Sequence, residues 1–356
     1  MNNKGLYIHV PFCVRKCRYC DFYSVTDLSL TEAYTKAVLR NVADISDEFD
    51  TVYFGGGTPS MLTAGQVSEI LSAVKIVPNA EISMECNPNS VTENYLRDIR
   101  GIGVNRLSFG VQSFCDTELK MLGRLHTSAE AISAINSAHA AGFENISADL
   151  MLAVSGQTKV SLLQSLDILE TLPLTHVSAY MLKVEEGTPL ARDEKLLAGI
   201  PDDDMTAEMY LLAVKKLESM GFEQYEISNF AKRNFECRHN LKYWHCEEYY
   251  GIGPAAHSFV DGERYCCPKS AEDFILSETQ GKVTLESGGS ESEKAMLALR
   301  LTKEGIAENS LSETSRKSAE ILVQKGLMKK EQDSFKLTPE GCLVSNQIII
   351  FLGLVQ

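Results

Sequence analysis

Three cysteines stand close together in the segment Cys13-Val14-Arg15-Lys16-Cys17-Arg18-Tyr19-Cys20. A single strand or helix would point side chains with this spacing in several directions, so we expect a loop wrapped around a metal centre. A structural zinc ion takes four ligands, usually as two separated pairs, and no second pair follows this trio. His9 is nearby, but it falls within a strand pattern, where a histidine is more often part of a core or pocket than a ligand.

A [4Fe–4S] cluster normally takes four thiolates. With only Cys13, Cys17 and Cys20 as ligands, one iron is left open to an exchangeable ligand. The arginine and lysine residues between these cysteines offset the charge of the thiolates, and we expect them to lower the pKa values of the thiols. The spacing Cys-x3-Cys-x2-Cys therefore favours an iron–sulfur cluster with one open iron over a zinc ion.

The chain of 356 residues carries a formal charge of −14, from 34 Lys and Arg against 48 Asp and Glu. An acidic surface repels phosphate backbones, so this charge disfavours nucleic-acid binding. Apolar runs such as residues 348–352 are far shorter than the ~20 residues that span a bilayer, so we expect no integral membrane segment. No signal-peptide pattern opens the chain. We therefore predict a cytoplasmic protein, in which the ten cysteines are reduced rather than paired.

Short apolar stretches alternate with stretches of helical period along the first half of the chain. Such alternation indicates an α/β fold with a parallel sheet. Six units that close part-way would make an incomplete (β/α)6 barrel, with functional residues at the carboxyl ends of its strands. The predicted strands are residues 6–10, 51–54, 81–85, 106–109, 146–150 and 176–182. The predicted helices include residues 31–45, 63–74, 91–99, 129–141 and 160–172.

Glycine and polar residues follow these strands. The second strand runs into Gly55-Gly56-Gly57-Thr58-Pro59, where glycines let the backbone approach a ligand closely; a simple tight turn is the alternative. Glu85 ends the third strand, and Gln112 and Asp149 lie at the ends of the fourth and fifth. Arg124 falls in a predicted helical stretch and suits a carboxylate partner. Each residue alone is more often a cap or loop residue, but their shared position favours a binding site.

The cysteine spacing resembles that of the radical S-adenosylmethionine (SAM) superfamily, whose members have an incomplete (β/α) barrel. The resemblance implies that the amino and carboxylate groups of SAM chelate the open iron. Tyr7-Ile8-His9-Val10-Pro11-Phe12 further resembles the anaerobic coproporphyrinogen dehydrogenase (HemN-like) group of that superfamily. The SAM site that this resemblance implies consists of Tyr7, Tyr19, Gly56, Gly57, Thr58, Glu85, Gln112, Arg124 and Asp149.

Two departures separate the chain from the oxidases of that group. Phe22 stands where the oxidases have a further cysteine, and their long N-terminal extension has no counterpart before Tyr7. Both departures agree with the related HemW-type haem chaperones. In addition, His239-Asn240-Leu241-Lys242-Tyr243-Trp244 matches the His-Asn-x-x-Tyr-Trp motif typical of that family. The resemblance implies that the protein binds haem and passes it to an acceptor apoprotein.

The residues of this motif suit a haem site. An imidazole such as that of His239 ligates haem iron, and Tyr243 and Trp244 offer flat apolar faces to a macrocycle. From the residues alone, the alternative is that His239 caps a turn while the two aromatic residues anchor a core. His245 and Cys246 adjoin the motif and are alternative axial ligands.

We predict three regions along the chain: a partial barrel with the cluster and SAM over residues 1–200, a connecting region with the haem motif over 201–285, and a winged-helix-like module over 286–356. Winged helices commonly read DNA. Residues 291–340, however, contain nine Lys or Arg and nine Asp or Glu, so they lack the positive charge that DNA binding needs. We therefore interpret this module as a packing or partner-binding element.

Three functions fit these observations. The first, which we favour, is a haem chaperone that carries a SAM-ligated [4Fe–4S] cluster, receives electrons from a donor and transfers haem to an acceptor; the residues leave open whether SAM is cleaved. The second is an oxygen-independent coproporphyrinogen III dehydrogenase, in which a SAM-derived radical abstracts hydrogen from propionate side chains that then lose carbon dioxide. The third is a zinc-stabilised adaptor whose winged-helix-like tail recruits partners.

Overall fold

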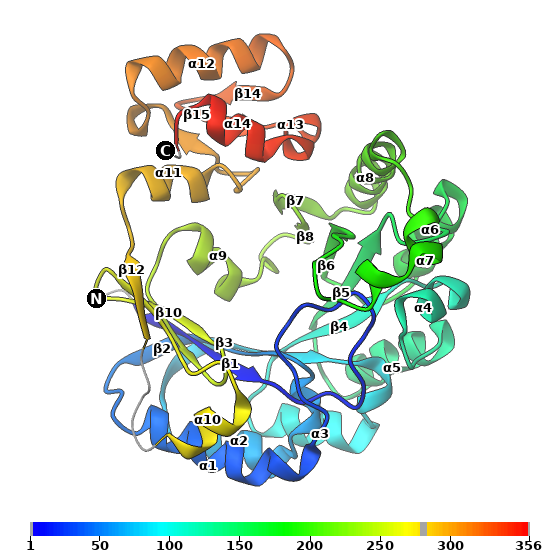
Figure 1. Ribbon diagram of the computed structural model, residues 1–356, viewed down its shortest axis with the longest axis vertical. Helices are drawn as coiled ribbons and strands as arrows, with labels where there is room; N and C mark the ends of the chain where they lie inside the picture. The colour runs from blue at the N-terminus through cyan, green and yellow to red at the C-terminus, as the bar shows by residue number, and fades with distance from the viewer. Residues whose placement is uncertain (1–2, 278–282, 355–356) are drawn as a thin grey trace.

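The computed structural model describes residues 3–277 and 283–354 and contains a mostly parallel sheet with helices on its outer side (Figure 1). Residues 1–2, 278–282 and 355–356, which belong to the three predicted regions, lie outside this description. Strands β1 to β6 pair in parallel in chain order and curve into an incomplete barrel, as predicted. They are β1 (Lys4–Val10), β2 (Glu48–Gly56), β3 (Lys75–Cys86), β4 (Arg106–Gln112), β5 (Asn145–Leu152) and β6 (His176–Met181).

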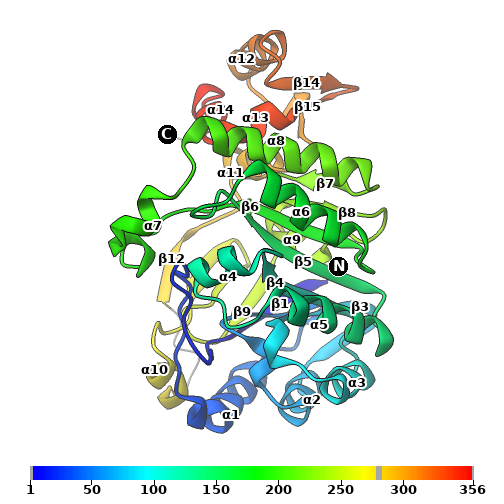
Figure 2. The same cartoon turned by 90° about the vertical axis from the view of Figure 1, so that its right-hand side faces the viewer.

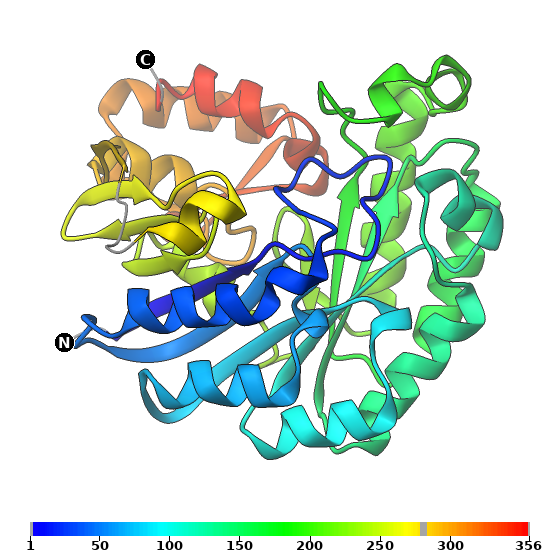
Figure 3. The ribbon, with the colours of Figure 1, turned by 60° about the horizontal axis from the view of Figure 1, so that its bottom comes forward.

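Helices connect these strands and cover the outer face of the sheet (Figures 2 and 3). Three of them begin with a capping box, in which Thr63, Thr127 or Thr158 exchanges hydrogen bonds with the residue three positions later. These reciprocal bonds satisfy donors that a helix start leaves unpaired, and all three helices begin within one residue of the predicted position. The helices are α1 (Thr31–Val42), α2 (Ala64–Ser72), α3 (Glu93–Gly101), α4 (Asp116–Leu122), α5 (Ser128–Ala140) and α6 (Lys159–Glu170).

Side chains on these strands alternate between the helix-covered face and the inside of the barrel. On β1, Leu6, Ile8 and Val10 are fully buried in the hydrophobic core, whereas Tyr7 and His9 lie on the opposite face of the strand. The inward face of the other strands is largely polar. Its residues include Tyr53, Glu85, Arg106, Ser108, Asp149, Ser178 and Tyr180.

The chain beyond β6 extends the same sheet at both edges. At one edge, β8 (Asn229–Ala231) pairs antiparallel with β6, and β7 (Glu223–Glu226) pairs with β8. At the other edge, β9 (Tyr249–Ile252) pairs in parallel with β1. It is followed by β10 (His257–Val260), β11 (Glu263–Cys266) and β12 (Val283–Ser287). The sheet therefore continues past residue 200, the position at which we predicted a boundary between regions.

The helices of this connecting region pack against different parts of the barrel. Helix α8 packs on α6, α10 packs on α1, and α9 contacts β2 inside the barrel. Figure 1 shows α9 between the two edges of the open barrel, so the chain crosses from β8 to β9 through this helix. Their bounds are α7 (Glu194–Ala198), α8 (Asp203–Ser219), α9 (Arg238–Trp244) and α10 (Ala271–Leu276).

The last part of the chain forms its own three-stranded antiparallel sheet, in the order β13-β15-β14. A helix, a short strand, a second helix, a hairpin and two further helices follow one another in this part of the chain. The elements are α11 (Glu291–Ala298), β13 (Ile306–Ala307), α12 (Glu313–Gln324), β14 (Met328–Glu331), β15 (Ser334–Leu337), α13 (Pro339–Leu343) and α14 (Ser345–Phe351).

Arg124 does not lie in a helix, and our expectation on this point was wrong. Helix α4 ends at Leu122 because Gly123 adopts a left-handed conformation, with φ of +76°. Arg124 follows in the loop between α4 and α5, with its backbone N–H still bonded to the Leu119 carbonyl oxygen at 2.9 Å. The loop position lets its side chain turn toward the barrel interior.

Close packing at the β9 edge gives a test of the fold. A Cβ on Gly251 would lie 2.0 Å from the carbonyl oxygen of His257. We expect Gly251→Ala to lower the free energy of unfolding by roughly 1–3 kcal/mol, as overpacking does, and to lower the urea midpoint. The control is Gly101→Ala at the end of α3, where an added Cβ meets nothing within 4 Å. Equal midpoints for the two variants would contradict the packing of β9 against β10.

Candidate functional site

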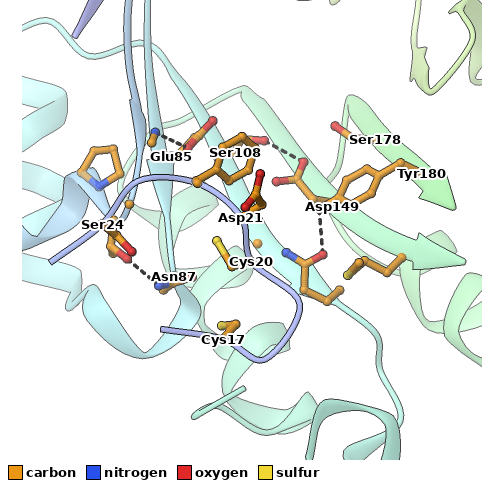
Figure 4. Close-up of a pocket in the computed structure, with 18 of the residues that line it drawn as sticks. Cys17, Cys20, Asp21, Ser24, Glu85, Asn87, Ser108, Asp149, Ser178 and Tyr180 are labelled. Atoms are coloured by element: carbon orange, nitrogen blue, oxygen red, sulfur yellow. Dashed lines mark hydrogen bonds between the residues drawn. The ribbon is translucent and has the colours of Figure 1, made fainter. Parts of the chain in front are cut away.

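A cavity of about 730 Å³ opens at the carboxyl ends of the barrel strands (Figure 4). Its lining comes from the cysteine loop after β1, the glycine segment after β2, the inward faces of β3 to β6, and α9. Of the site residues predicted from the sequence, Trp244 is the one that does not line it. Those that do are Tyr7, Cys13, Cys17, Tyr19, Cys20, Gly56, Gly57, Thr58, Glu85, Gln112, Arg124, Asp149, His239 and Tyr243.

The cysteine loop is held at both of its ends. Phe12 is fully buried and forms an isolated bridge with Val25, and the Cys13 N–H donates to the Val25 carbonyl oxygen at 3.0 Å. In the middle of the loop, the Arg18 N–H donates to the Leu122 carbonyl oxygen at 3.2 Å. These backbone bonds fix the loop that places the three thiols on the cavity wall.

The thiols have polar neighbours from other strands and loops. The Cys13 Sγ lies 3.5 Å from the Thr58 hydroxyl oxygen, and an Arg124 Nη1–H donates to the Cys17 Sγ at 3.5 Å. Burial raises the pKa of the Cys20 thiol and outweighs the lowering effect of Lys16, so our expectation of a lowered pKa is wrong for this thiol. Among the described residues, no three His, Cys, Asp or Glu side chains are grouped to hold a single metal ion.

The glycine segment packs closely against the base of the cysteine loop. Gly56 has a φ of +108°, and a Cβ there would lie 2.5 Å from the ring of His9. A Cβ on Gly57 would lie 2.9 Å from the Phe12 carbonyl oxygen, and the Gly57 N–H donates to the Val10 carbonyl oxygen at 2.8 Å. At least part of the need for glycine therefore comes from contact between two segments of the chain itself.

Glu85 lies in the wall with both carboxylate oxygens occupied. One accepts from the Tyr53 hydroxyl at 2.9 Å and the other from the Gly56 N–H at 3.1 Å. Burial, and next the nearby Asp149, raise the pKa of Glu85 to about 7. Burial also raises the pKa of Asp149, which accepts a hydrogen bond from Ser108 at 3.0 Å. Burial thus makes both carboxyl groups harder to ionise than free ones, and each is already oriented by its neighbours.

Arg124 is oriented by residues that sequence reasoning missed. Its Nη2 donates to the Asn87 side-chain oxygen at 2.6 Å and to the Gly110 carbonyl oxygen at 2.5 Å. Gln112 has a φ of +70°, and its side-chain oxygen accepts from the Tyr180 hydroxyl at 2.9 Å. Asn87 directly follows β3, and Tyr180 lies on an inward position of β6. The alternation of side chains along these two strands was a signal that could have identified them.

His239 and Tyr243 face the cavity, and each makes contacts within the wall. The His239 ring has Nδ1 at 2.8 Å from the Thr51 hydroxyl and Nε2 at 2.8 Å from the Tyr243 hydroxyl. Burial, followed by Lys242, lowers the pKa of His239 to about 3, so the imidazole is neutral. The helix start is bound to Glu81, which accepts from the His239 N–H at 3.1 Å. His239 therefore lies inside α9 and does not cap a turn.

Trp244 is on the other side of α9. Its ring lies under the Arg300 guanidinium, 4.4 Å from the ring centroid, at the contact between α9 and the C-terminal residues. His245 pairs there with Glu304 at 2.9 Å. Cys246 does not line the cavity either. The motif therefore presents His239, Asn240 and Tyr243 to the cavity and its tryptophan to the C-terminal part of the chain.

The Radical SAM superfamily model matches residues 7–169. Proteins named Heme chaperone HemW match nearly the whole chain. The one from Mycobacterium tuberculosis is 34% identical over 366 residues, 97% of this chain and 93% of the relative. The one from Bacillus subtilis is 33% identical over 380 residues, 98% and 99% of the two chains. The chain belongs to the HemW family.

The coproporphyrinogen III oxidase HemN from Escherichia coli, described as a radical SAM enzyme, has a related structure. It superposes with a TM-score of 0.84 at 18% identity, over 98% of this chain and 90% of HemN. At this identity the likeness concerns the fold alone, and it confirms the predicted barrel. Within residues 3–277 and 283–354, none of the helices combines the length and apolarity of a bilayer-crossing segment.

The raised pKa of Glu85 predicts a pH dependence of stability. An unfolded glutamate loses its proton near pH 4.5, whereas folded Glu85 keeps it to about pH 7. Between these values the unfolded chain binds fewer protons, so stability should fall as pH rises, by at most roughly 3 kcal/mol for this group. We expect Glu85→Gln to remove this fall in urea unfolding at pH 5, 6 and 7. The control, Glu69→Gln on the exposed side of α2, should follow wild type. Parallel curves for Glu85→Gln and wild type would contradict the raised pKa.

Proposed function

We propose that this protein is a haem chaperone that binds haem and transfers it to an acceptor apoprotein. The observation that carries this proposal is the identity of about a third, over nearly the full chain, to proteins named Heme chaperone HemW. The His-Asn-x-x-Tyr-Trp motif supports it, because α9 brings the histidine and tyrosine of the motif to the wall of the central cavity.

In this proposal Cys13, Cys17 and Cys20 hold a [4Fe–4S] cluster. The donor set fits such a group, because three thiols from one loop open into the same cavity, and cationic side chains from that loop and Arg124 offset thiolate charge. With SAM on its open iron, the cluster supplies a redox centre next to a sulfonium. We propose that Arg124 orients the carboxylate of SAM and Glu85 its amino group. Tyr7, Tyr19, Gly56, Gly57, Thr58, Gln112 and Asp149 complete this proposed site.

Elemental analysis separates this assignment from a zinc-stabilised adaptor. Anaerobically reconstituted protein should contain four irons and four acid-labile sulfides per chain. We expect Cys17→Ala to lose both, because two thiolates do not hold the cluster. The matched control is Cys86→Ala, since Cys86 is buried and lines the same cavity outside the cysteine loop. Zinc in place of iron, or full iron content in Cys17→Ala, would contradict the assignment.

We further propose that His239 ligates haem iron from the cavity wall. Its pKa of about 3 keeps the imidazole neutral, which is the form that binds metal ions. In the haem-free protein its Nε2 is hydrogen-bonded to Tyr243 at 2.8 Å, so coordination through this atom requires the tyrosine side chain to move. Tyr243 would then be free to contact the macrocycle. We assign Trp244 the anchoring of α9 through its contact with Arg300.

Haem titrations followed by absorption spectra test this arrangement. His239→Ala should weaken haem binding by about tenfold or more, because it removes the axial ligand. Tyr243→Phe should bind at least as tightly as wild type, since it removes the hydroxyl that competes for Nε2. Asn240→Ala serves as a control, because Asn240 lines the cavity next to His239 and offers no ligand to iron. Unchanged affinity in His239→Ala would remove this residue from the site.

An oxygen-independent coproporphyrinogen III dehydrogenase is the competing function. The HemN-like fold is compatible with it, but Phe22 replaces the extra cysteine of that group and is largely exposed, at 68%, at the cavity rim. Anaerobic incubation with coproporphyrinogen, SAM and a reductant should therefore yield no protoporphyrinogen. Turnover would favour the dehydrogenase over the chaperone.

The proposal also includes partners and a compartment. An electron donor would reduce the cluster, and an apoprotein would accept the haem. All ten cysteines are free thiols, which cluster ligation requires. A reducing compartment keeps cysteines in this state, so we propose that the protein acts in the cytoplasm.

A further inference from the structure

Arg106 is a buried cation at the amino-terminal end of β4. Its side chain lines the central cavity, although the residue is only 1% exposed. Among the described residues, its Nε and Nη1 have no hydrogen-bond partner. The neighbouring strand position on β3 is Ser83, which is also fully buried and whose hydroxyl has no partner in the described part of the chain. Two unsatisfied polar side chains therefore lie side by side at this end of the barrel.

Three buried carboxylates, those of Glu81, Glu85 and Asp149, interact electrostatically with Arg106, and none of them is bonded to its guanidinium in the described part of the chain. Glu81 acts electrostatically on Arg106, but within residues 3–277 and 283–354 no carboxylate oxygen lies within ion-pair distance, 4.0 Å, of its guanidinium. The Glu81 oxygens accept from the backbone N–H groups of Arg238 and His239, each at 3.1 Å, and from the Cys237 thiol at 3.7 Å. Glu81 thus holds the start of α9.

A charge removed from water without a direct partner is strongly unfavourable, so buried arginines are normally paired. The other carboxyl groups on the cavity wall, Glu85 and Asp149, have hydrogen-bond donors of their own. Arg106 differs from them because its Nε and Nη1, which carry three N–H donors, are shielded from water and have no partner among the described residues. A guanidinium presents its N–H groups as a planar fork that matches the two oxygens of a carboxylate.

We propose that Arg106 binds a carboxylate group of a ligand that lies in the central cavity. Ser108 and Ser178 line the same inner surface on β4 and β6, but their hydroxyls are bonded to Asp149, so the proposed carboxylate contact comes from Arg106. The ligand class is a porphyrin with free propionate groups, and this choice rests on the proposed haem binding. His239 and Tyr243 line the same cavity.

A second possible source of the carboxylate is SAM. Gln112, at the cluster end of β4, is six residues from Arg106, which corresponds to about 20 Å along the strand. The proposed partner of the SAM carboxylate, Arg124, contacts Cys17 at the cluster end. The SAM carboxylate already has Arg124 as its proposed partner, and this favours the porphyrin. Glu85, the proposed partner of the SAM amino group, nevertheless lies only two residues along β3 from Ser83, the strand neighbour of Arg106, so the test includes SAM.

The test compares haem with its dimethyl ester, in which both propionates are neutral. Cluster-loaded wild type should bind haem at least about tenfold more tightly than the ester, as expected for charge-assisted hydrogen bonds. In Arg106→Met this preference should disappear through weaker binding of haem, with little change for the ester. The matched control is Arg97→Met, an exposed arginine paired with Glu93 on α3, and it should keep the preference. An undiminished preference in Arg106→Met would overturn the proposal.

Arg106→Lys covers the case in which the methionine variant does not fold. Lysine keeps the buried charge, and with it any balance with Glu81, but it lacks the planar fork. We expect its preference for haem over the ester to fall several-fold. If lysine retained the full wild-type preference, carboxylate recognition by the guanidinium would be ruled out.

A titration with SAM distinguishes the two carboxylate sources and separates this proposal from the proposed function. Two results together would assign the carboxylate to SAM. Wild type would bind haem and its ester equally well, and Arg106→Met would bind SAM about tenfold more weakly than wild type. If wild type bound neither porphyrin, the chaperone function would fail, and the SAM titration alone would decide. Unchanged SAM affinity in that case would overturn the carboxylate site as well.

Thermal unfolding of the cluster-loaded protein without haem or SAM addresses a purely structural role. An unpaired buried charge destabilises the empty protein, so Arg106→Met should unfold at the same temperature as wild type or higher. If Arg106 instead served mainly to balance Glu81, its loss would leave that carboxylate uncompensated. A fall in the unfolding temperature of several degrees, absent in Arg97→Met, would contradict the proposal.

Discussion

Each strand of the barrel has to bury one row of side chains under helices and turns the other row inward. On β1 this constraint places Leu6, Ile8 and Val10 in the core and Tyr7 and His9 on the inner side. Because polar groups taken out of water need partners, the inner row must satisfy itself or meet a ligand. The central cavity is the consequence, and its chemistry follows from which inner residues found partners within the chain.

Most of the inner polar residues did find partners. Glu85 receives donors from β2 and the glycine segment, and Arg124 is bound by Asn87 and a carbonyl oxygen of β4. Such bonds orient groups before a ligand arrives, which reduces the cost of ordering them on binding. Arg106 stands apart, because its charge is buried but its donors are not used. The wall thus contains groups that are already oriented and one buried cation whose Nε and Nη1 have no hydrogen-bond partner among the described residues.

Helix α9 links the cavity to the rest of the molecule. Glu81 on β3 accepts hydrogen bonds from its first turn, and His239 and Tyr243 face the cavity. On its other side, Trp244 packs under Arg300, which in turn lies 3.6 Å from the buried carboxylate of Glu226 on β7. One short helix therefore contacts the barrel, the proposed haem site and the C-terminal residues, so movement of Tyr243 on ligand binding would occur next to that contact.

The sequence by itself determined the features that depend on neighbouring residues. The Cys13–Cys20 loop follows from ligand spacing, the strands and helices from side-chain periodicity, and the starts of three helices from capping boxes at Thr63, Thr127 and Thr158. Tertiary structure alone decided that β8 and β9 join opposite edges of one sheet. It also decided that Trp244 faces away from the cavity and that Nε and Nη1 of Arg106 have no hydrogen-bond partner among the described residues. The contacts that form the sheet edges and the Trp244 site join residues about 50 to more than 240 positions apart, and local patterns carry no information about which distant groups will meet.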